Sequence, residues 1–264
     1  MPDVPDDVRD PLDLSGRVAL VTGGTRGVGR GIAARFARAG ARVVVCGRTE
    51  PDDPDPTTEF VAADVRDAAS VDALVDAVVA RAGRLDVLVN NAGGSPPADT
   101  ATASPRFSRA IIELNLLAPL LCTQRANAQM QNQDDGGVVV NVASVSGVRP
   151  SPGTAAYGAA KAGLLNLTTT LAVELAPKVR VNAVTVGYVV TEQAHLFYGD
   201  DDGIAAVGAT VPLGRMAEPA DVADVCLFLA SPLARYVSGA NVVVHGGGER
   251  PAYLGAARNT APPT

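Results

Sequence analysis

The stretch Arg17-Val-Ala-Leu-Val-Thr22 and its continuation, Gly23-Gly-Thr-Arg-Gly-Val-Gly29, predict the fold of this chain. The first part is a short apolar run, which is typical of a buried strand. The second part is a glycine-rich turn, and apolar residues at helical spacing follow it as far as Ala39. Gly40 then provides a C-terminal stop for that helix. The order of strand, glycine turn and helix is that of a unit in an α/β sheet.

The glycine turn also indicates a ligand. Gly23, Gly27 and Gly29 can adopt positive φ angles and let the backbone approach a pyrophosphate closely. The N-terminus of the following helix would stabilise the charge of such a group. The spacing Gly-x-x-x-Gly-x-Gly differs, however, from the usual Gly-x-Gly-x-x-Gly fingerprint. A strand-to-helix turn without a ligand therefore stays open as the alternative.

The rest of the chain repeats the alternation of strands and helices. Further strands are expected at 42–46, 59–63, 86–90, 137–143, 179–184 and 241–245, and further helices at 71–82, 107–130, 157–175 and 221–230. Seven mostly parallel strands with helices on both faces make a single doubly wound α/β domain. Right-handed crossovers bring the carboxyl ends of the strands to one edge, where ligands bind.

Three segments depart from this regular pattern. Residues 50–56 are acidic and contain three prolines, so we expect a loop where such folds usually have a helix. The helix over 107–130 is expected to bend near Pro119. The stretch 187–213 is interpreted as a loop.

The composition argues against several classes of protein. The 264-residue chain carries a net charge of −6, which disfavours nucleic acid or an anionic membrane as its main partner. It has no tryptophan and few other aromatic residues that could stack on bases. Its three cysteines are far apart and it has two histidines, so we expect no metal site. The unpaired cysteines, the acidic N-terminal segment and the lack of a membrane-spanning apolar run predict a soluble cytoplasmic protein.

A tyrosine and a lysine lie close together in Tyr157-Gly-Ala-Ala-Lys161. On a helix they would share one face, and a fixed positive charge would lower the pKa of the phenol toward a useful range for acid–base catalysis. Ser144 follows the strand over 137–143, so it would lie at the carboxyl edge, where the helix with Tyr157 begins. Two hydroxyl donors at one oxygen stabilise the alkoxide character that hydride transfer to a ketone creates. Two alternatives stay open: Ser144 could be a turn residue, and Tyr157 could be a packed aromatic residue.

These motifs together resemble the short-chain dehydrogenase/reductase family. The resemblance rests on Thr22–Gly29, Asn90-Asn-Ala-Gly93, Asn115, Ser144 and Tyr157-x-x-x-Lys161, and it covers roughly residues 14 to 248. It implies a single Rossmann-type domain, a nicotinamide cofactor and a homo-oligomer, either a tetramer or a dimer. We accordingly divide the chain into a flexible N-terminal arm (1–15), a dinucleotide-binding catalytic domain (16–250) and a C-terminal tail (251–264).

The resemblance implies a role for each residue of the site. Ser144 would hold the substrate oxygen, and Tyr157 would exchange a proton with it. Lys161 would lower the tyrosine pKa and bind the nicotinamide ribose, and Asn115 would anchor a water in a proton relay. Inside a helix, Asn115 could equally make a local hydrogen bond. Asp64 resembles the residue whose carboxylate meets the adenine amine in the family, although it could equally cap a turn. The residues expected to bind the cofactor are Gly23, Thr25, Arg26, Gly27, Val28, Gly29, Arg48, Asp64, Val65, Asn91, Ala92, Gly93, Tyr157, Lys161, Gly187, Val189 and Thr191.

The tip of the second strand bears on which dinucleotide binds. An acidic residue there would bind the ribose 2′-hydroxyl of NAD, but this chain has Gly47 followed by Arg48. Arg48 and Arg26 suit the 2′-phosphate of NADP(H), which a guanidinium binds with two hydrogen bonds. We therefore expect NADP(H). NAD(H) stays the alternative, because carboxylates of the loop 50–55 could repel that phosphate or replace the missing aspartate, and both arginines could be surface charges alone.

The segment after the sixth strand departs from the family pattern at one position. Val186 stands where the family usually has proline, and the loss of a fixed φ is expected to loosen the turn. Residues 192–211 are expected to form a lid over a mainly apolar substrate, because they contain the run His195-Leu-Phe-Tyr198. A partly ordered surface loop is the alternative. Ser95-Pro-Pro97 would form the opposite wall.

We expect an NADP(H)-dependent ketoreductase or secondary-alcohol dehydrogenase, whose partner is a small-molecule carbonyl or alcohol. Two hypotheses come from other classes: a catalytically silent dinucleotide-binding regulator and a structural subunit of a hetero-oligomer. A silent regulator would be expected to have lost the tyrosine or the lysine. This chain keeps both, together with the serine and the asparagine.

Overall fold

Seven strands form one sheet, in the order β3-β2-β1-β4-β5-β6-β7, in this computed structural model, which describes residues 10–256. Every pair of neighbouring strands is parallel. The strands are β1 (Val18–Thr22), β2 (Arg42–Gly47), β3 (Thr58–Ala62), β4 (Val87–Asn90), β5 (Gly137–Ser144), β6 (Val179–Val186) and β7 (Asn241–Val244). The prediction of a doubly wound α/β domain is confirmed.

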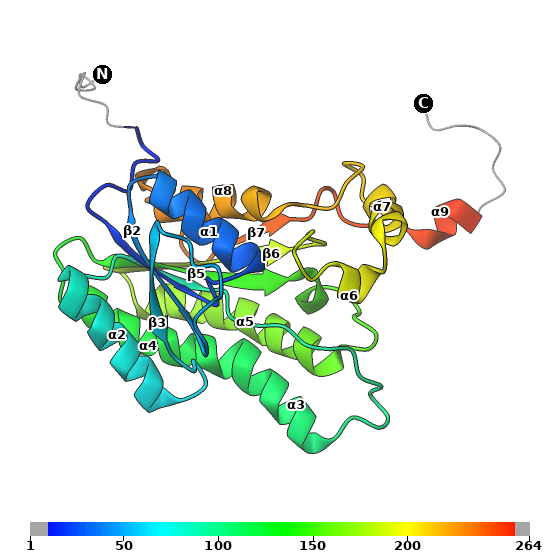
Figure 1. Cartoon of the computed structure of the whole chain (residues 1–264), viewed down its shortest axis with the longest axis horizontal. Helices are drawn as coiled ribbons and strands as arrows, with labels where there is room; N and C mark the ends of the chain where they lie inside the picture. The colour runs from blue at the N-terminus through cyan, green and yellow to red at the C-terminus, as the bar shows by residue number, and fades with distance from the viewer. Residues whose placement is uncertain (1–9, 257–264) are drawn as a thin grey trace.

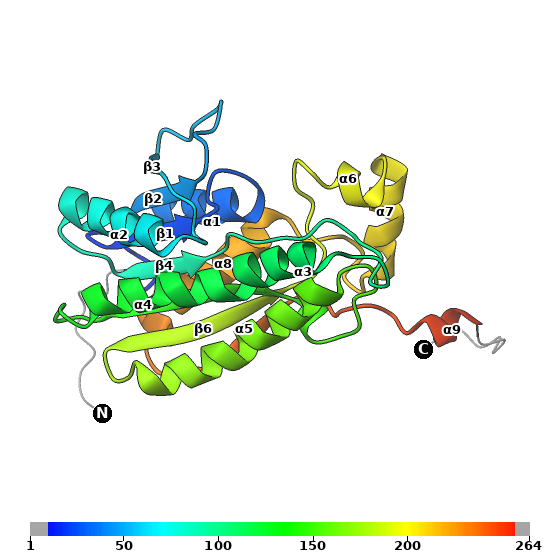
Figure 2. The ribbon, with the colours of Figure 1, turned by 90° about the horizontal axis from the view of Figure 1, so that it is seen from below.

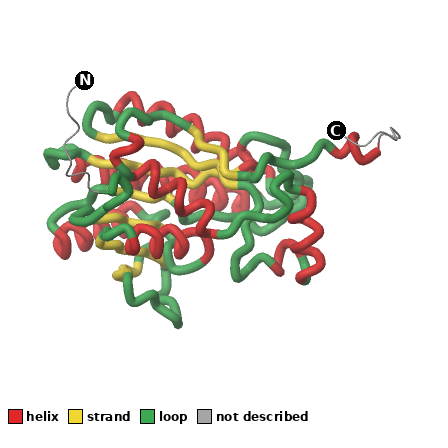
Figure 3. Tube along the Cα trace, turned by 90° about the horizontal axis from the view of Figure 1, so that it is seen from above, coloured by secondary structure: helices red, strands yellow, loops and turns green. Residues whose placement is uncertain are grey.

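Helices cover both faces of the sheet. The longer ones are α1 (Gly27–Arg38), α2 (Ala68–Ala82), α3 (Pro105–Ile112), α4 (Ala118–Met130), α5 (Ala155–Glu174), α7 (Asp201–Thr210) and α8 (Pro219–Ala230). The shorter ones are α6 (His195–Tyr198), α9 (Ala252–Ala256), a π-helical turn at Glu113–Leu117 and 3₁₀ turns at Val145–Gly147 and Pro232–Ala234. α1 and α8 lie on one face, and α2, α4 and α5 lie on the other (Figures 1 and 2). Figure 3 shows the strands running between these helices.

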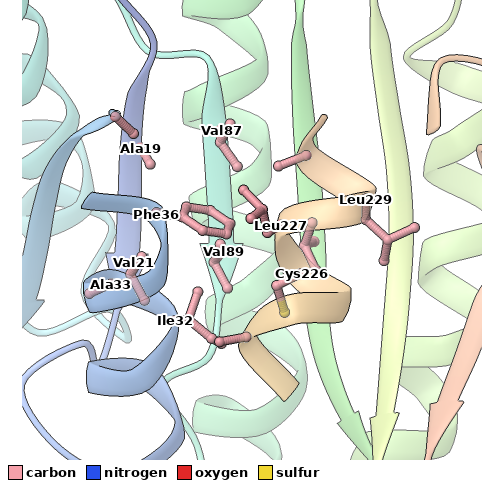
Figure 4. Packing of buried hydrophobic residues seen from close by; sticks show 14 of the residues in the cluster. Ala19, Val21, Ile32, Ala33, Phe36, Val87, Val89, Cys226, Leu227 and Leu229 are labelled. Carbon is pink, nitrogen blue, oxygen red and sulfur yellow. The ribbon is translucent and has the colours of Figure 1, made fainter. Parts of the chain in front are cut away.

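The core between α1, α8 and the sheet holds β1 and α1 in place. Ile32 and Phe36 of α1 pack beside Cys226 and Leu227 of α8, and none of these side chains is more than 1% exposed (Figure 4). Each large apolar side chain that is buried fully in this way stabilises the fold by about 1.5–3 kcal/mol. This packing fixes the start of α1, and with it the glycine turn that follows β1.

The direction in which strands are added reverses beside β1. β2 and β3 lie on one side of β1, while β4 pairs with its other side. In open α/β sheets, ligands bind at the carboxyl ends of the strands beside such a reversal. The glycine turn follows β1 at this point, and the segment Asn90–Gly93 follows β4. Both motifs predicted to bind the dinucleotide therefore meet at the position where the topology favours one.

Two predicted segments differ in the structure. The stretch 187–213, which we expected to be a loop, contains α6 and α7, and Asp200 caps α7 by accepting a hydrogen bond from Gly203 N at 3.0 Å. The helical region over 107–130 is not one regular α-helix, because it contains a π-helical turn at Glu113–Leu117 directly before Pro119, whose missing N–H cannot bond to the carbonyl four residues earlier. The predicted loop between β2 and β3 is confirmed over residues 48–57.

The two ends of the domain carry more structure than an arm and a tail suggest. Leu14 is 2% exposed within the core, and its N–H donates to Ala39 O at 2.6 Å. α9 forms within the segment expected to be a tail, near the end of the molecule that carries α6 and α7 (Figure 1). The mobility expected for residues 1–9 and 257–264 lies outside the described residues.

Candidate active site

Ser144, Tyr157 and Lys161 come together at the carboxyl edge of the sheet. Ser144 is the last residue of β5, and Tyr157 lies in the first turn of α5. The Ser144 hydroxyl lies close enough to the Tyr157 phenol to influence its pKa, and Ser144 Oγ accepts a hydrogen bond from Ser146 N at 3.2 Å. Lys161 Nζ lies 5.7 Å from the centroid of the Tyr157 ring. The structure therefore brings the three side chains together as the sequence predicts.

Burial dominates the protonation of this group. Loss of water raises the pKa of Tyr157, and the hydrogen bond with Ser144 only partly offsets that rise. The net direction is thus opposite to the lowering that we predicted from the nearby lysine. Burial also lowers the pKa of Lys161 to about 8, and its ammonium donates to Val142 O at 2.8 Å. At neutral pH the lysine keeps its proton, but it does so at a cost to the fold.

Asn115 joins the site through the backbone of a neighbouring turn. It is completely buried in the π-helical turn, a type of helix that often occurs at functional sites. Its Oδ1 accepts from Gly94 N at 2.9 Å, and its Nδ2 donates to Gly94 O at 3.0 Å and to Ile111 O at 2.9 Å. A Cβ atom on Gly93 would lie 2.7 Å from Asn115 Oδ1 and 3.4 Å from Lys161 Nζ. The missing side chain of Gly93 thus leaves room for the asparagine and the lysine to approach this turn.

The glycine turn has the shape of a cradle for an anion. Gly23 and Gly27 have φ angles of 62° and 53°, which confirms the predicted left-handed backbone at these two positions. Gly29 has no positive φ, and it is needed for another reason, because a Cβ atom there would overlap Gly23 O and Asn91 Nδ2. α1 begins at Gly27 with no capping side chain at Arg26 and no acidic residue in its first turn. Its N-terminus therefore suits the pyrophosphate of a dinucleotide.

The segment after β4 is locked onto this turn. Thr22 Oγ1 accepts hydrogen bonds from Asn91 N and Ala92 N, both at 3.0 Å. Asn91 Nδ2 donates to Thr22 O at 3.0 Å and to Gly23 O at 3.1 Å. The amide of Asn91 is therefore occupied in holding the glycine turn. Its contribution to a cofactor site is to keep the backbone of that turn in place.

The two arginines expected near the ribose are exposed. Within residues 10–256, no hydrogen bond or ion pair engages the side chain of Arg26 or Arg48. The acidic loop, by contrast, has partners for two of its carboxylates. Asp53 pairs with Arg30 at 3.0 Å, and Asp55 accepts from Thr57 N at 2.9 Å and from Thr57 Oγ1 at 2.6 Å. Neither of these two carboxylates therefore neutralises Arg26 or Arg48.

The predicted adenine side differs from expectation at Asp64. Arg66 donates to both oxygens of this carboxylate, from Nε at 2.9 Å and from Nη2 at 2.5 Å, and these bonds lower the pKa of Asp64 to about 2. Any contact of Asp64 with adenine must therefore be shared with Arg66. Val65 is 6% exposed and belongs to the core, so only its backbone can face a cofactor.

The turn after β6 is held although proline is missing at Val186. Gly187 N donates to Val244 O at 2.9 Å, and a Cβ atom on Gly187 would lie 2.8 Å from His245 Cβ. Val189 forms a β-bridge with Ala217. Backbone pairing on both sides thus replaces the rigidity that a proline ring would give.

Comparisons with known proteins agree with this geometry. A family model described as enoyl-(acyl carrier protein) reductase matches residues 23–249. An oxidoreductase of Methylorubrum extorquens is 39% identical over 246 residues, which cover 89% of this chain and 98% of the relative. A 3α-hydroxysteroid dehydrogenase of Mediterraneibacter gnavus is 36% identical over 245 residues, which cover 88% of this chain and 97% of the relative. The crystal structure of a short-chain alcohol dehydrogenase from Sinorhizobium meliloti superposes with a TM-score of 0.83 at 35% identity. The match covers 89% of this chain and 97% of that structure.

The chain belongs to the short-chain dehydrogenase/reductase family. As a member, it is an NAD(P)-dependent oxidoreductase that transfers hydride, and the silent regulator is not favoured. Within the described residues of this short-chain dehydrogenase/reductase, no helix is long and apolar enough to cross a membrane. Among residues 10–256, no three or more His, Cys, Asp or Glu side chains form a group that could hold a metal ion.

The sequence analysis missed a polar cluster on the substrate side of this dehydrogenase/reductase. Arg149 Nη2 lies 3.1 Å from Tyr188 Oη and 2.5 Å from Glu249 Oε1, and Tyr188 Oη donates to the same carboxylate oxygen at 2.8 Å. The Tyr188 ring meets Tyr198 of α6 edge-on, with 5.9 Å between the centroids. Of the predicted lid residues, Tyr198 thus faces inward while Leu196 and Phe197 are 66% and 58% exposed. The cluster escaped notice because its members follow three different strands.

Proposed function

We propose that this enzyme reduces a ketone, or oxidises the corresponding secondary alcohol, with NADPH or NADP⁺ and with Tyr157 as its proton donor and acceptor. The observation that carries the proposal is that Ser144 and Tyr157 lie together beside the buried Lys161, at the carboxyl edge next to the glycine cradle.

The two hydroxyl groups act on the substrate oxygen. Ser144 Oγ accepts from Ser146 N, so its own hydrogen is available to the oxygen of a bound carbonyl. Tyr157 donates the second hydrogen bond and transfers its proton as negative charge develops on that oxygen. When bound, the reduced nicotinamide supplies the hydride that reaches the carbonyl carbon. Both side chains are half-buried, and this partial loss of water strengthens their hydrogen bonds to the substrate oxygen.

Lys161 makes the proton transfer easier. Loss of the proton leaves a phenolate in a buried place, where an isolated negative charge is costly. The Lys161 ammonium over the ring offsets part of that cost. With a pKa of about 8 the lysine is charged at neutral pH, which this role requires. The role of Asn115 in anchoring a relay water stays a prediction, and its observed bonds to Gly94 and Ile111 support a share in holding the turn beside Lys161.

The preference for NADP(H) is supported by the charges at the tip of β2. Arg26 and Arg48 form no ion pair among residues 10–256, although Asp64 lies near enough to Arg48 for that charge to lower its pKa, whereas the acidic loop has partners for Asp53 and Asp55. Gly47 leaves no carboxylate at the position that would bind a 2′-hydroxyl. Two unpaired guanidiniums favour a ligand with a phosphate there.

Arg48→Ala is expected to raise the Kd for NADPH by about tenfold, because a charge-assisted hydrogen bond to the 2′-phosphate is lost. The Kd for NADH should change by less than about twofold, since NADH lacks that phosphate. Titration of cofactor fluorescence measures both constants. Arg235→Ala is a matched control, because Arg235 is exposed and lies before the amino end of β7, at the opposite edge of the sheet. Equal losses for the two cofactors in Arg48→Ala would discard the 2′-phosphate assignment.

A screen of NADPH oxidation over ketones tests the proposed reaction itself. Suitable substrates range from short 3-oxoacyl thioesters to 3-oxosteroids and quinones, with sugars included because Arg149, Tyr188 and Glu249 make one end of the substrate side polar. A carbonyl compound that is reduced with equal consumption of NADPH supports the proposal. If no member of the panel is turned over in either direction, the ketoreductase assignment fails.

We further propose a homo-oligomer in the cytoplasm. The edge strand β7 leaves Val243 46% exposed, and Val173 near the end of α5 is 79% exposed, which favours burial against other copies of the chain. Cys46, Cys122 and Cys226 are free and buried. Burial raises the pKa of each thiol to about 11 or 12, so these cysteines stay unreactive in a reducing compartment. Sedimentation of the purified enzyme measures the size of the assembly.

A further inference from the structure

A carboxylate from the predicted lid segment lies on the N-terminus of α1. The N–H of Gly27 donates to both oxygens of Glu192, with 3.3 Å to Oε1 and 3.1 Å to Oε2. Glu192 comes from the segment between β6 and α6, far from α1 in the sequence. Gly27 is the first residue of α1 and one of the glycines of the cradle. A negatively charged side chain of the protein thus occupies the amide expected to bind the cofactor pyrophosphate.

The surroundings of Glu192 explain why it lies there. α1 has no side-chain cap and no acidic residue in its first turn, so its free N–H groups and positive end attract an anion. Arg30, one turn into α1, lies near enough for the Glu192 carboxylate to raise its pKa together with Asp53 and Asp55. The Thr191 side chain also lies against Gly27, since a Cβ atom added there would be 3.5 Å from Thr191 Cγ2. The residue before Glu192 therefore holds the carboxylate at the turn.

We propose that Glu192 competes with the cofactor pyrophosphate for the Gly27 amide and thereby weakens the binding of nicotinamide dinucleotides. A carboxylate and a pyrophosphate cannot both accept this hydrogen bond, and their like charges would repel each other beside the same amide. The cofactor must therefore displace Glu192, and its apparent affinity is reduced by the free energy of the Glu192–Gly27 contact. The inference rests on the proposed binding of the pyrophosphate at the N-terminus of α1.

Because the pyrophosphate is common to NADPH and NADH, removal of the Glu192 charge should tighten both cofactors by the same factor. Glu192→Gln keeps an oxygen that can accept from Gly27 N but loses the charge, and Glu192→Ala removes the contact altogether. An anion at a helix N-terminus that is exposed to solvent gains up to about 1 kcal/mol, which corresponds to about fivefold in affinity. We expect Kd to fall by about three- to fivefold in both variants and for both cofactors.

Calorimetric titration of each variant with NADPH and with NADH tests the proposal. Glu174→Gln is the matched control, because it removes the same charge from an exposed position at the end of α5. Its Kd values should equal those of the wild type. Glu192 is itself exposed, so neither variant removes a buried group, and circular dichroism verifies that each is folded.

Unchanged or higher Kd values in both Glu192 variants would overturn the proposal. A gain for NADPH alone would do so as well, because it would assign the effect to the 2′-phosphate and not to the pyrophosphate. These outcomes leave the proposed function intact, since the wild type still binds its cofactor. Failure of the wild type and all variants to bind either dinucleotide would instead overturn the proposed function and this inference together.

Discussion

Tyr157→Phe is expected to lower kcat for ketone reduction by about a hundred- to ten-thousandfold, the range typical for loss of a general acid. The phenylalanine ring fills the same space in the first turn of α5 but has no proton to transfer and no hydrogen bond for Ser144. The Kd for NADPH should change little, because Lys161 and the glycine cradle are untouched. Steady-state kinetics together with cofactor titration separates these two effects.

Tyr236→Phe is the matched control for this experiment. Tyr236 is 100% exposed, and its substitution removes the same hydroxyl group from a position outside the site. Its kcat should equal that of the wild type. If Tyr157→Phe keeps more than roughly a tenth of the wild-type kcat, the loss is smaller than that of a general acid, and Tyr157 is not the proton donor.

Lys161→Met is expected to abolish activity and to make the protein more stable at neutral pH. The fall of the lysine pKa from 10.5 to about 8 corresponds to roughly 3 kcal/mol by which burial disfavours the ammonium. Methionine has a similar length and no charge to bury. It leaves Val142 O without its partner, which costs about 1 kcal/mol. Denaturant unfolding at pH 7 should therefore show a gain of about 2 kcal/mol, while kcat falls by at least about a hundredfold.

The pH dependence of this gain gives a second measurement. The folded wild type releases the Lys161 proton near pH 8, whereas the unfolded chain holds it up to about 10.5. Between these values the unfolded state binds more protons, so the stability of the wild type rises with pH. The advantage of Lys161→Met should accordingly shrink from pH 8 to pH 10.5. A variant that is no more stable at pH 7 and keeps the wild-type pH slope would show that Lys161 is not buried as an ammonium.

Sequence periodicity was sufficient to predict the strands of the sheet and most of the helices. The continuous apolar run Val18–Val21 is typical of a strand buried on both faces, and β1 lies inside the sheet with a neighbour on each side. The three prolines of residues 50–56 excluded a helix, and none forms there. α6 was missed because it has only four residues, and α7 was missed because it lacks a strong apolar stripe and contains Gly203 and Gly208. Asp200 starts α7 as a capping residue, a signal that was present in the sequence.

The same limits apply to the site. Ser144, Tyr157 and Lys161 could be predicted because their spacing around one strand and one helix fixes their positions. The net pKa shift of Tyr157 could not, since it depends on how much water the finished fold removes from the phenol. Glu192 and Arg66 were missed for a different reason: each meets its partner through loop conformation, which apolar periodicity does not encode. Glu192 could nevertheless have drawn attention as the acidic residue directly after Thr191.

The central claim is that this enzyme delivers hydride from NADPH to a carbonyl carbon while Tyr157 protonates the oxygen. The measurement that tests it most directly uses NADPH deuterated at both C4 positions, with a ketone that the wild type reduces. We predict that the isolated alcohol carries one deuterium on the carbon that bears the hydroxyl group, and that Tyr157→Phe forms almost none of this product. An alcohol without deuterium on that carbon, or labelled product formed equally well by Tyr157→Phe, would contradict the account.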